Sequence, residues 1–225
     1  MVMNKLVRYI FDNKRKNSIV SKMRQKRFKF FISFLNSFDK PINILDVGGT
    51  QSYWEMMDFI DCKEIHVTLL NLTKINTIGD GFSSIVGDAR DMKNIQDQEY
   101  DIVYSNSVIE HLNVIEDQEK MVSEIKRVGK YYFLQTPNKY FPIEPHFLFP
   151  FFQFFPLSLK AWLVCHFNVG SYSKVSDFES AKKISSSIRL LSKNELSELF
   201  KDSIIYREKF LFLTKSLIVY NHIIN

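Results

Sequence analysis

Short apolar runs along the chain alternate with stretches in which apolar residues recur at helical spacing. The runs lie at residues 42–47, 64–72, 83–86, 131–136 and in the segment that starts at Tyr100. The helical pattern occurs between them, at residues 53–60 and 118–127. Runs that are apolar at nearly every position indicate strands buried on both faces. Strands that alternate with helices predict an α/β domain with a mostly parallel sheet.

The C-terminal part of the chain adds a helix and a pair of strands. Ser192, with Glu195 three residues later, predicts an N-terminal capping box. Residues 204–211 and 215–220 predict a closing hairpin that contributes an antiparallel strand. The polar, serine-rich segment 170–187 predicts a mobile lid.

The first strand ends in an acidic residue and two glycines. Asp46 lies at the carboxyl end of the run 42–47, and Gly48 and Gly49 follow after Val47. Glycines let the backbone turn sharply and lie against a ligand, because no Cβ stands in the way. A carboxylate at the end of a parallel strand lies where open α/β sheets bind ligands. An ordinary strand-to-helix turn, with local hydrogen bonds from Asp46, is the alternative interpretation.

This stretch resembles the first motif of the class I S-adenosylmethionine-dependent methyltransferases, in which an acid, one residue and then glycines follow the first strand. The resemblance implies a Rossmann-like, seven-stranded, mostly parallel sheet with a terminal antiparallel strand and helices on both faces. It also implies S-adenosylmethionine as the cofactor, bound by Asp46, Gly48 and Gly49.

Three later positions correspond to further cofactor contacts of this family. Asn71 ends the second strand, where the family has an acid that holds the ribose hydroxyls; an amide oxygen still accepts a hydroxyl proton but brings no charge. Asp88 corresponds to the acceptor for the adenine amino group, and Ala89 to the backbone amide that meets the adenine ring. A simple turn at Asn71 and a helix N-cap at Asp88 are the alternatives.

The fourth strand and the residues after it carry the strongest resemblance. The segment from Tyr100 to Leu112 joins a strand to a small polar linker and the letters V-I-E-H-L, similar to the small-molecule branch of the class I methyltransferases. Ser105, in this segment, is assigned to the cofactor site. His111 is a candidate general base because an imidazole accepts a proton near neutral pH, and an architectural role is the alternative. The proline-rich motif of amino-methylating DNA enzymes does not occur here.

Residues 138–190 form an aromatic-rich insertion after the fifth strand, above the predicted substrate position. Glu144 and His146 are two residues apart, so in an extended chain they share a face and are an acid–base candidate pair. Structural roles are the alternative for both. The phenylalanines predict either a lid with its own core, an apolar pocket for a lipid-like substrate, or a membrane-surface patch.

Charge is concentrated at the N-terminus. Residues 1–40 hold eleven Lys or Arg and two acids, whereas the whole chain of 225 residues has a net charge of +5. This basic helical leader either covers the sheet with its cations in water, or binds an anionic membrane or a polyanion. Cys62 and Cys165 are far apart, which fits a reducing, cytoplasmic setting, and we expect no metal site and no membrane-spanning helix.

These observations predict a leader (1–40) and a class I methyltransferase domain (41–221) that includes the insertion (138–190). The predicted reaction is O-methylation of a small molecule, sugar or lipid-linked intermediate, with peripheral membrane contact through the leader and the insertion. Nucleic acid is not the expected partner. The alternatives are an RNA or protein methyltransferase that uses the basic leader, and a non-catalytic module with the methyltransferase fold.

Overall fold

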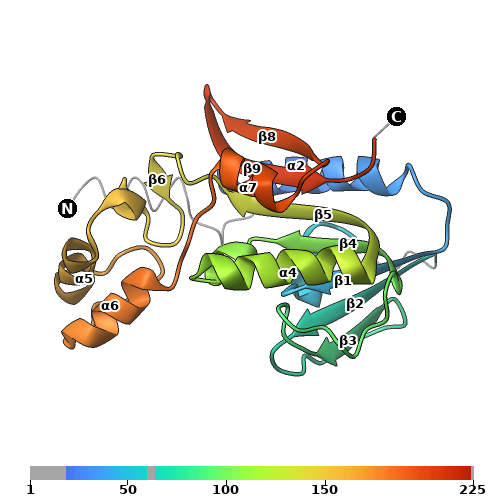
Figure 1. The fold of residues 1–225 in the computed structure, drawn as a ribbon, viewed down its shortest axis with the longest axis horizontal. Helices are drawn as coiled ribbons and strands as arrows, with labels where there is room; N and C mark the ends of the chain where they lie inside the picture. Colours follow the sequence, from blue (N-terminus) through green and yellow to red (C-terminus); the bar gives the residue numbers. More distant parts are fainter. Residues whose placement is uncertain (1–18, 60–63, 224–225) are drawn as a thin grey trace.

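A single seven-stranded sheet organises the molecule, which we describe from a computed structural model covering residues 19–59 and 64–223 (Figure 1). Its strand order is β3-β2-β1-β4-β5-β9-β8. The strands are β1 (Ile42–Val47), β2 (Ile65–Asn71), β3 (Phe82–Val86), β4 (Tyr100–Asn106), β5 (Gly129–Pro137), β8 (Ile204–Phe210) and β9 (Leu213–Tyr220). The first five are parallel, and β9 runs antiparallel to both β5 and β8. The predicted fold class is confirmed.

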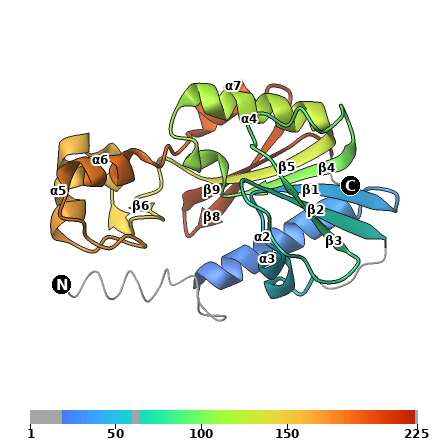
Figure 2. The same ribbon diagram turned by 90° about the horizontal axis from the view of Figure 1, so that it is seen from below.

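Helices cover both faces of the sheet (Figure 2). They are α2 (Ile19–Leu35) and α3 (Gln51–Met56) on one face, and α4 (Ile115–Val128) and α7 (Lys193–Leu199) on the other. Successive side chains of β1 point to opposite faces of the sheet. Ile44 therefore packs in the layer under α2, and Leu45 packs in the layer under α4. The capping box predicted for Ser192 and Glu195 is present at the start of α7.

The described part of the basic leader packs on the sheet through phenylalanines spaced along one face of α2. Phe28, Phe31 and Phe34 are buried, and the Phe31 ring centroid lies 4.4 Å from that of Tyr104 on β4. Burial of large aromatic rings is a strong contribution to packing, so α2 is part of the core. One cation of α2 does not remain in water as expected: Arg27 is buried. Residues 1–18 of the leader and Cys62 lie outside the described residues.

The insertion forms a small layer of its own beyond the carboxyl end of β5 (Figure 1). It contains β6 (Ile143–Glu144), β7 (Phe149–Pro150), the 3-10 helix η2 (Phe152–Phe154), α5 (Leu157–His166) and α6 (Phe178–Ser186). Phe147, Phe152, Ala161, Val164 and Ala181 are buried in a cluster separate from the two layers of the sheet. The insertion therefore has its own hydrophobic core.

The second half of the segment 170–187, predicted as a mobile lid, is the helix α6, and its mobility stays a prediction. Asp177 caps this helix, because its Oδ2 accepts a 2.7 Å hydrogen bond from the amide of Ser180. Ala181 then packs into the core of the insertion. None of the described helices combines the length and apolar character needed to cross a bilayer.

Candidate active site

The glycine turn after β1 is built around the buried carboxylate of Asp46. Oδ2 of Asp46 accepts a 2.7 Å hydrogen bond from Nε1 of Trp54, on α3. A Cβ at Gly49 would lie 1.7 Å from the same oxygen, so a glycine is required there. Gly48 has φ +76°, and a Cβ there would lie 2.7 Å from a methyl group of Val108. Burial raises the pKa of Asp46 to about 7, and the bond from Trp54 opposes this shift.

A first cavity of about 480 Å³ lies at the carboxyl ends of β1, β2 and β4, where open α/β sheets bind ligands. We call it the cofactor cavity. Its lining includes five residues that the sequence assigned to the site: Gly48, Asn71, Asp88, Ala89 and His111.

The polar groups of the cofactor cavity fit an adenosyl group. Nδ2 of Asn71 donates a 2.9 Å hydrogen bond to the carbonyl oxygen of Gly49. This bond turns the amide so that its oxygen remains as the acceptor for a hydroxyl. Ala89 belongs to the same lining, next to Asp88. A bare glycine backbone, an amide acceptor and an acid thus surround one space at the end of the sheet.

Asp88 is already engaged by a neighbouring arginine. Nη2 of Arg90 donates to Oδ2 of Asp88 over 2.6 Å, and Nε of Arg90 contacts both carboxylate oxygens. Arg90 also bonds Asp117, which lies in the same lining. The hydrogen bonds from Arg90 hold the pKa of Asp88 below its usual value. Asp88 is therefore ionised at neutral pH, and a ligand amino group would share it with Arg90.

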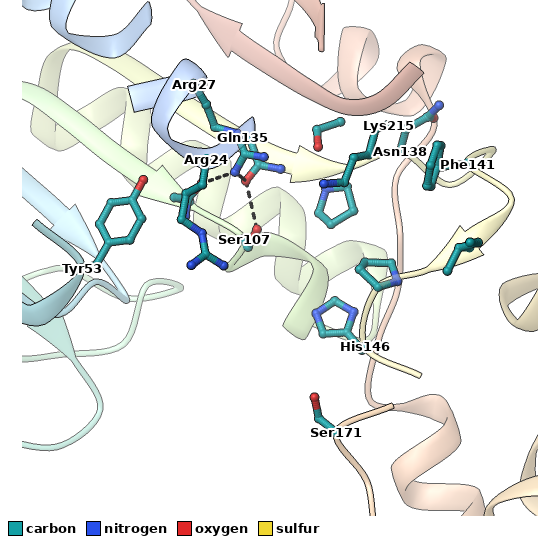
Figure 3. Close-up of a pocket in the computed structure, with 15 residues that line it drawn as sticks. Arg24, Arg27, Tyr53, Ser107, Gln135, Asn138, Phe141, His146, Ser171 and Lys215 are labelled. Atoms are coloured by element: carbon teal, nitrogen blue, oxygen red, sulfur yellow. Dashed lines mark hydrogen bonds between the residues drawn. The ribbon is translucent and has the colours of Figure 1, made fainter. Parts of the chain in front are cut away.

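A second cavity of about 330 Å³ lies between α2, the end of β5 and the insertion (Figure 3). We call it the acceptor cavity. Arg24 and Arg27 reach it from α2, Lys215 from β9 and His146 from the insertion. Figure 3 shows Arg24 on one side of this space and Lys215 and His146 on the other. The basic leader therefore forms one wall of a pocket, which the sequence did not predict.

Arg27 is fixed in that wall by polar contacts with three residues. Its Nη1 donates to Oδ1 of Asn106 and to Oε1 of Gln135, both at 2.9 Å. Its Nη2 forms a 2.8 Å ion pair with Oε2 of Glu208, on β8. Burial lowers the pKa of Arg27, but the charge and hydrogen bond of Glu208 outweigh it, and the net shift is upward. Arg27 is a structural cation with its charge already balanced.

Arg24 and Lys215 bring further positive charge to the lining of the acceptor cavity. Arg24 forms no hydrogen bond or ion pair with another residue in the described part of the chain. Burial, together with the charges of Arg27 and Arg24, lowers the pKa of Lys215 to about 8. Burial also lowers the pKa of Arg24. Depressed pKa values of this kind indicate crowded, desolvated cations, which an anion would stabilise.

The two cavities meet at a pair of histidines from different parts of the chain. His111 lines the cofactor cavity and His146 the acceptor cavity, and their ring centroids are 5.0 Å apart. His111 belongs to the 3-10 helix η1 (Ile109–His111), which follows β4 after Ser107 turns the chain with φ +59°. His146 is placed by a loop whose backbone is held against Ser171, since the Ser171 amide donates to the His146 carbonyl over 3.0 Å.

Glu144 holds His146 in one orientation. Its Oε1 lies 2.7 Å from Nδ1 of His146, and its Oε2 accepts from the amides of His146 and Phe147. Burial lowers the pKa of His146, but the bond and charge of Glu144 outweigh it and the net shift is upward. Burial and the charge of His146 lower the pKa of His111. The predicted Glu144–His146 pair thus exists, with Nε2 of His146 left for another group.

Four predicted site residues, Asp46, Gly49, Ser105 and Glu144, do not line either cavity. Asp46 lies beneath Gly49, and Ser105 is fully buried with no hydrogen-bond partner for its Oγ in the described structure. They support the turn from below, and their assignment to cofactor binding stays a prediction. The cationic residues Arg24, Arg27 and Lys215 were missed, because their distance along the sequence hides the pocket that they share.

Comparisons with known proteins agree with this arrangement. Residues 47–131 match the model of a family described as "Methyltransferase domain". Two Mycobacterium tuberculosis proteins, "Uncharacterized protein MT1557" and "Uncharacterized protein Rv1509", are each 36% identical over 58 residues. That match covers 26% of this chain and only 20% of each relative, so the chain spans about a fifth of their length.

Solved structures share the fold at low sequence identity. The CurJ carbon methyltransferase has a TM-score of 0.56 and 11% identity, over 91% of this chain and 55% of that one. A SAM-dependent methyltransferase from Aquifex aeolicus has a TM-score of 0.53 and 13% sequence identity, over 96% of each chain. An O-methyltransferase family protein from Burkholderia thailandensis has a TM-score of 0.53 and 10% sequence identity, over 89% of this chain and 56% of that one. Carbon and oxygen methyltransferases are both similar, so the fold does not select the acceptor atom.

Proposed function

We propose that this chain, a class I S-adenosylmethionine-dependent methyltransferase by its fold and by its methyltransferase domain, transfers the methyl group to an oxygen atom of an anionic acceptor. The observation that carries the proposal is the pair of adjoining cavities that meet at His111 and His146. One cavity has the polar groups for an adenosyl ligand, and the other is lined by cations.

S-adenosylmethionine, when bound, supplies a methyl group on a positively charged sulfur. An acceptor oxygen would take this methyl group as the carbon–sulfur bond broke, and the electron pair of that bond would stay on sulfur. Since the leaving thioether is neutral, the chain mainly has to position the acceptor and exclude water. The turn at Gly48 and the amide of Asn71 would hold the cofactor on one side of the histidine pair.

The charge of the acceptor cavity supports an acceptor with a phosphate or carboxylate group. Arg24 and Lys215 face a partly enclosed space, and Arg27 forms its wall. In such a space an anion forms charge-assisted hydrogen bonds that are stronger than those between neutral groups. A sugar phosphate and a lipid-linked phosphate share this chemistry, and both also carry hydroxyl groups.

An oxygen acceptor is supported by the histidine pair. A hydroxyl must lose its proton as the new bond forms, whereas a carbon–hydrogen bond needs a stronger base. Nε2 of His146 faces the junction because Glu144 occupies Nδ1. The junction therefore contains a group able to assist the loss of a hydroxyl proton.

Exposed apolar side chains on the insertion support a contact with a membrane surface, where a lipid-linked acceptor would lie. Phe151, Phe154, Trp162 and Phe167 have 46–53% of their surface exposed. Aromatic rings at this exposure suit the headgroup region of a bilayer. Phe151→Ser combined with Trp162→Ser should weaken binding to anionic vesicles. Ile78→Ser, at an exposed apolar site outside the insertion, should not; equal binding by all variants contradicts this contact.

The acceptor proposal is tested by measuring release of S-adenosylhomocysteine with hydroxyl compounds that differ only in a phosphate or carboxylate. We expect methylation of the anionic members, with an O-methyl group in the product by mass spectrometry and NMR. Arg24→Gln should raise KM for them at least tenfold and leave S-adenosylhomocysteine affinity unchanged. Lys26→Gln, an exposed cation on the same helix, is the matched control. Neutral acceptors used equally well, or a methylated carbon, would overturn the proposal.

The two alternatives predict different results. A nucleic-acid enzyme would bind RNA with strong salt dependence, although Arg24 and Arg27 of the leader face the acceptor cavity. A non-catalytic module would show no calorimetric heat with S-adenosylmethionine up to millimolar concentration.

A further inference from the structure

We propose that Glu110, His111 and His146 bind one divalent transition-metal ion at the junction of the two cavities. The sequence led us to expect no metal site, and these residues come from two segments 35 positions apart. In the fold, each offers one ligand atom, and the three atoms lie within 4.8 Å of one another. Such a group needs only a small closure to surround an ion, since ligand atoms about 2.0–2.2 Å from a metal lie roughly 3–3.5 Å apart.

The carboxyl group of Glu110 is unusual for a buried acid. Glu110 is fully buried, and its Oε2 accepts a 3.0 Å hydrogen bond from Oγ1 of Thr136. Its Oε1 is buried and has no hydrogen-bond partner in the described structure. Leaving a buried carboxylate oxygen without a partner is costly. A cation bound at this oxygen would remove the cost.

The surrounding residues hold the ligands as outer partners do in metal sites. Oε1 of Glu144 lies 2.7 Å from Nδ1 of His146, which fixes the imidazole with Nε2 as the ligand atom. A carboxylate on the second nitrogen of a metal-bound histidine is a recurrent arrangement. Thr136 plays the same part for Glu110. The ring nitrogens of His111 have no hydrogen bond to another described residue and are available.

The ligand types indicate which metals fit. Two imidazoles and one carboxylate suit Zn²⁺, Co²⁺, Mn²⁺ or Fe²⁺, and do not suit Ca²⁺, which prefers oxygen ligands. Three protein ligands leave at least one coordination position open toward the cavities.

A role for the ion rests on the proposed function. His146 lines the acceptor cavity and His111 the cofactor cavity, so an ion between them would meet the acceptor's hydroxyl next to the methyl group. A divalent metal lowers the pKa of an oxygen that it binds. The hydroxyl proton would then leave to water, and His146 would act as a ligand in place of a free base.

Metal binding is tested without any acceptor. Metal-free, untagged chain is titrated with Zn²⁺ by calorimetry and with Co²⁺ by visible absorption. We expect one equivalent to bind and the Tm to rise. Glu110→Gln and His146→Gln should each weaken Zn²⁺ binding at least 100-fold, and Glu144→Gln about 10–100-fold through the orientation of His146. His166→Gln, at the exposed end of α5, is the matched control and should bind as the wild type does.

Two readouts separate a failed inference from a misfolded variant or a wrong function. Circular dichroism and S-adenosylhomocysteine affinity are measured on every variant. Glu110→Gln keeps the size of the buried side chain and should remain folded. If folded Glu110→Gln and His146→Gln bind Zn²⁺ like the wild type, or the wild type does not bind it, the metal site is refuted. If Zn²⁺ binds at the cluster but S-adenosylhomocysteine does not bind, the metal site stands and the proposed function fails.

Discussion

Nε1 of Trp54 donates a 2.7 Å hydrogen bond to Oδ2 of Asp46, inside the turn that leads from β1 into α3. Both side chains are buried, at 0% and 1% exposure. The bond therefore joins the first strand to the first crossover helix at the edge of the cofactor cavity. It also makes the stability of this turn depend on a carboxylate that water does not reach.

Trp54→Phe tests this bond. Phenylalanine keeps most of the ring packing but removes the donor, so Asp46 loses its partner while it remains buried. We expect the free energy of unfolding to fall by about 1–3 kcal/mol, measured by urea denaturation at pH 7.5. Trp162→Phe changes the chain's other tryptophan, which is exposed on α5, and should have little effect. Equal losses for the two variants would contradict a specific role for the bond.

Asp46 should also make stability depend on pH. Its pKa is raised from 3.8 when unfolded to about 7 when folded. The folded state thus binds the proton more tightly, and the stability gained at low pH is lost as pH rises toward 7. Between pH 5 and pH 8 the wild type should lose roughly 2–3 kcal/mol more than Asp46→Asn. Parallel pH profiles of the two proteins would show that Asp46 is ionised throughout.

Gly49→Ala should disrupt the turn, because the new Cβ would overlap the Asp46 carboxylate. Overpacking of this kind costs about 1–3 kcal/mol. Since Gly49 is also the acceptor for Asn71, we expect S-adenosylhomocysteine affinity to fall at least tenfold in calorimetry. Gly81→Ala adds a methyl group where nothing lies within 4 Å, and it should preserve both properties. Normal ligand affinity in Gly49→Ala would show that the turn does not shape the site.

The Arg27–Glu208 ion pair should stabilise the fold at the wall of the acceptor cavity, and substitutions of its two residues test this. Glu208→Gln leaves a buried guanidinium without its counter-charge, so we expect a loss of about 3–5 kcal/mol. Glu198→Gln, at an exposed acid on α7, should lose almost nothing. Replacing both partners, Arg27→Met with Glu208→Leu, should be less destabilising than Glu208→Gln alone. A double variant as unstable as the sum of the single changes would contradict this interpretation.

Anion binding should weaken at alkaline pH. The pKa of Lys215 is lowered from 10.5 to about 8, so this lysine loses its charge as pH rises through 8. The Kd of inorganic pyrophosphate, used as a probe, should rise up to about tenfold between pH 7 and pH 9. Lys215→Gln should bind it weakly at both pH values, with this pH dependence removed. Lys26→Gln should show the same pH dependence of the Kd as the wild type. If Lys215→Gln kept this pH dependence, a group other than Lys215 would be its cause.

The sequence predicts local features of this fold well and long-range neighbours poorly. The apolar run 42–47 and the Ser192–Glu195 capping box depend on adjacent residues, and both occur as predicted. The helix α6 was missed, although Asp177 followed by Ser180 is an N-cap signal in the sequence. The serine content of the surrounding segment favoured a loop over this signal.

The composition of the two cavities could not be predicted in the same way. Arg24 and Lys215 are separated by most of the chain, and no periodicity relates His111 to His146. These pairs meet only because α2 packs beside β9 and the insertion folds back over the end of the sheet. The family resemblance predicts which residues bind the cofactor, but it carries no information on the contacts of the insertion.

The ion pair between Arg27 and Glu208 also sets an order of events during synthesis. A ribosome releases α2 early, while β8 is among the last elements to emerge. Until that strand arrives, Arg27 has no counter-charge, although Phe31 of the same helix packs on Tyr104 of β4. The acceptor cavity, which takes Lys215 from β9 and whose wall depends on Glu208 of β8, can therefore be complete only after both strands have emerged.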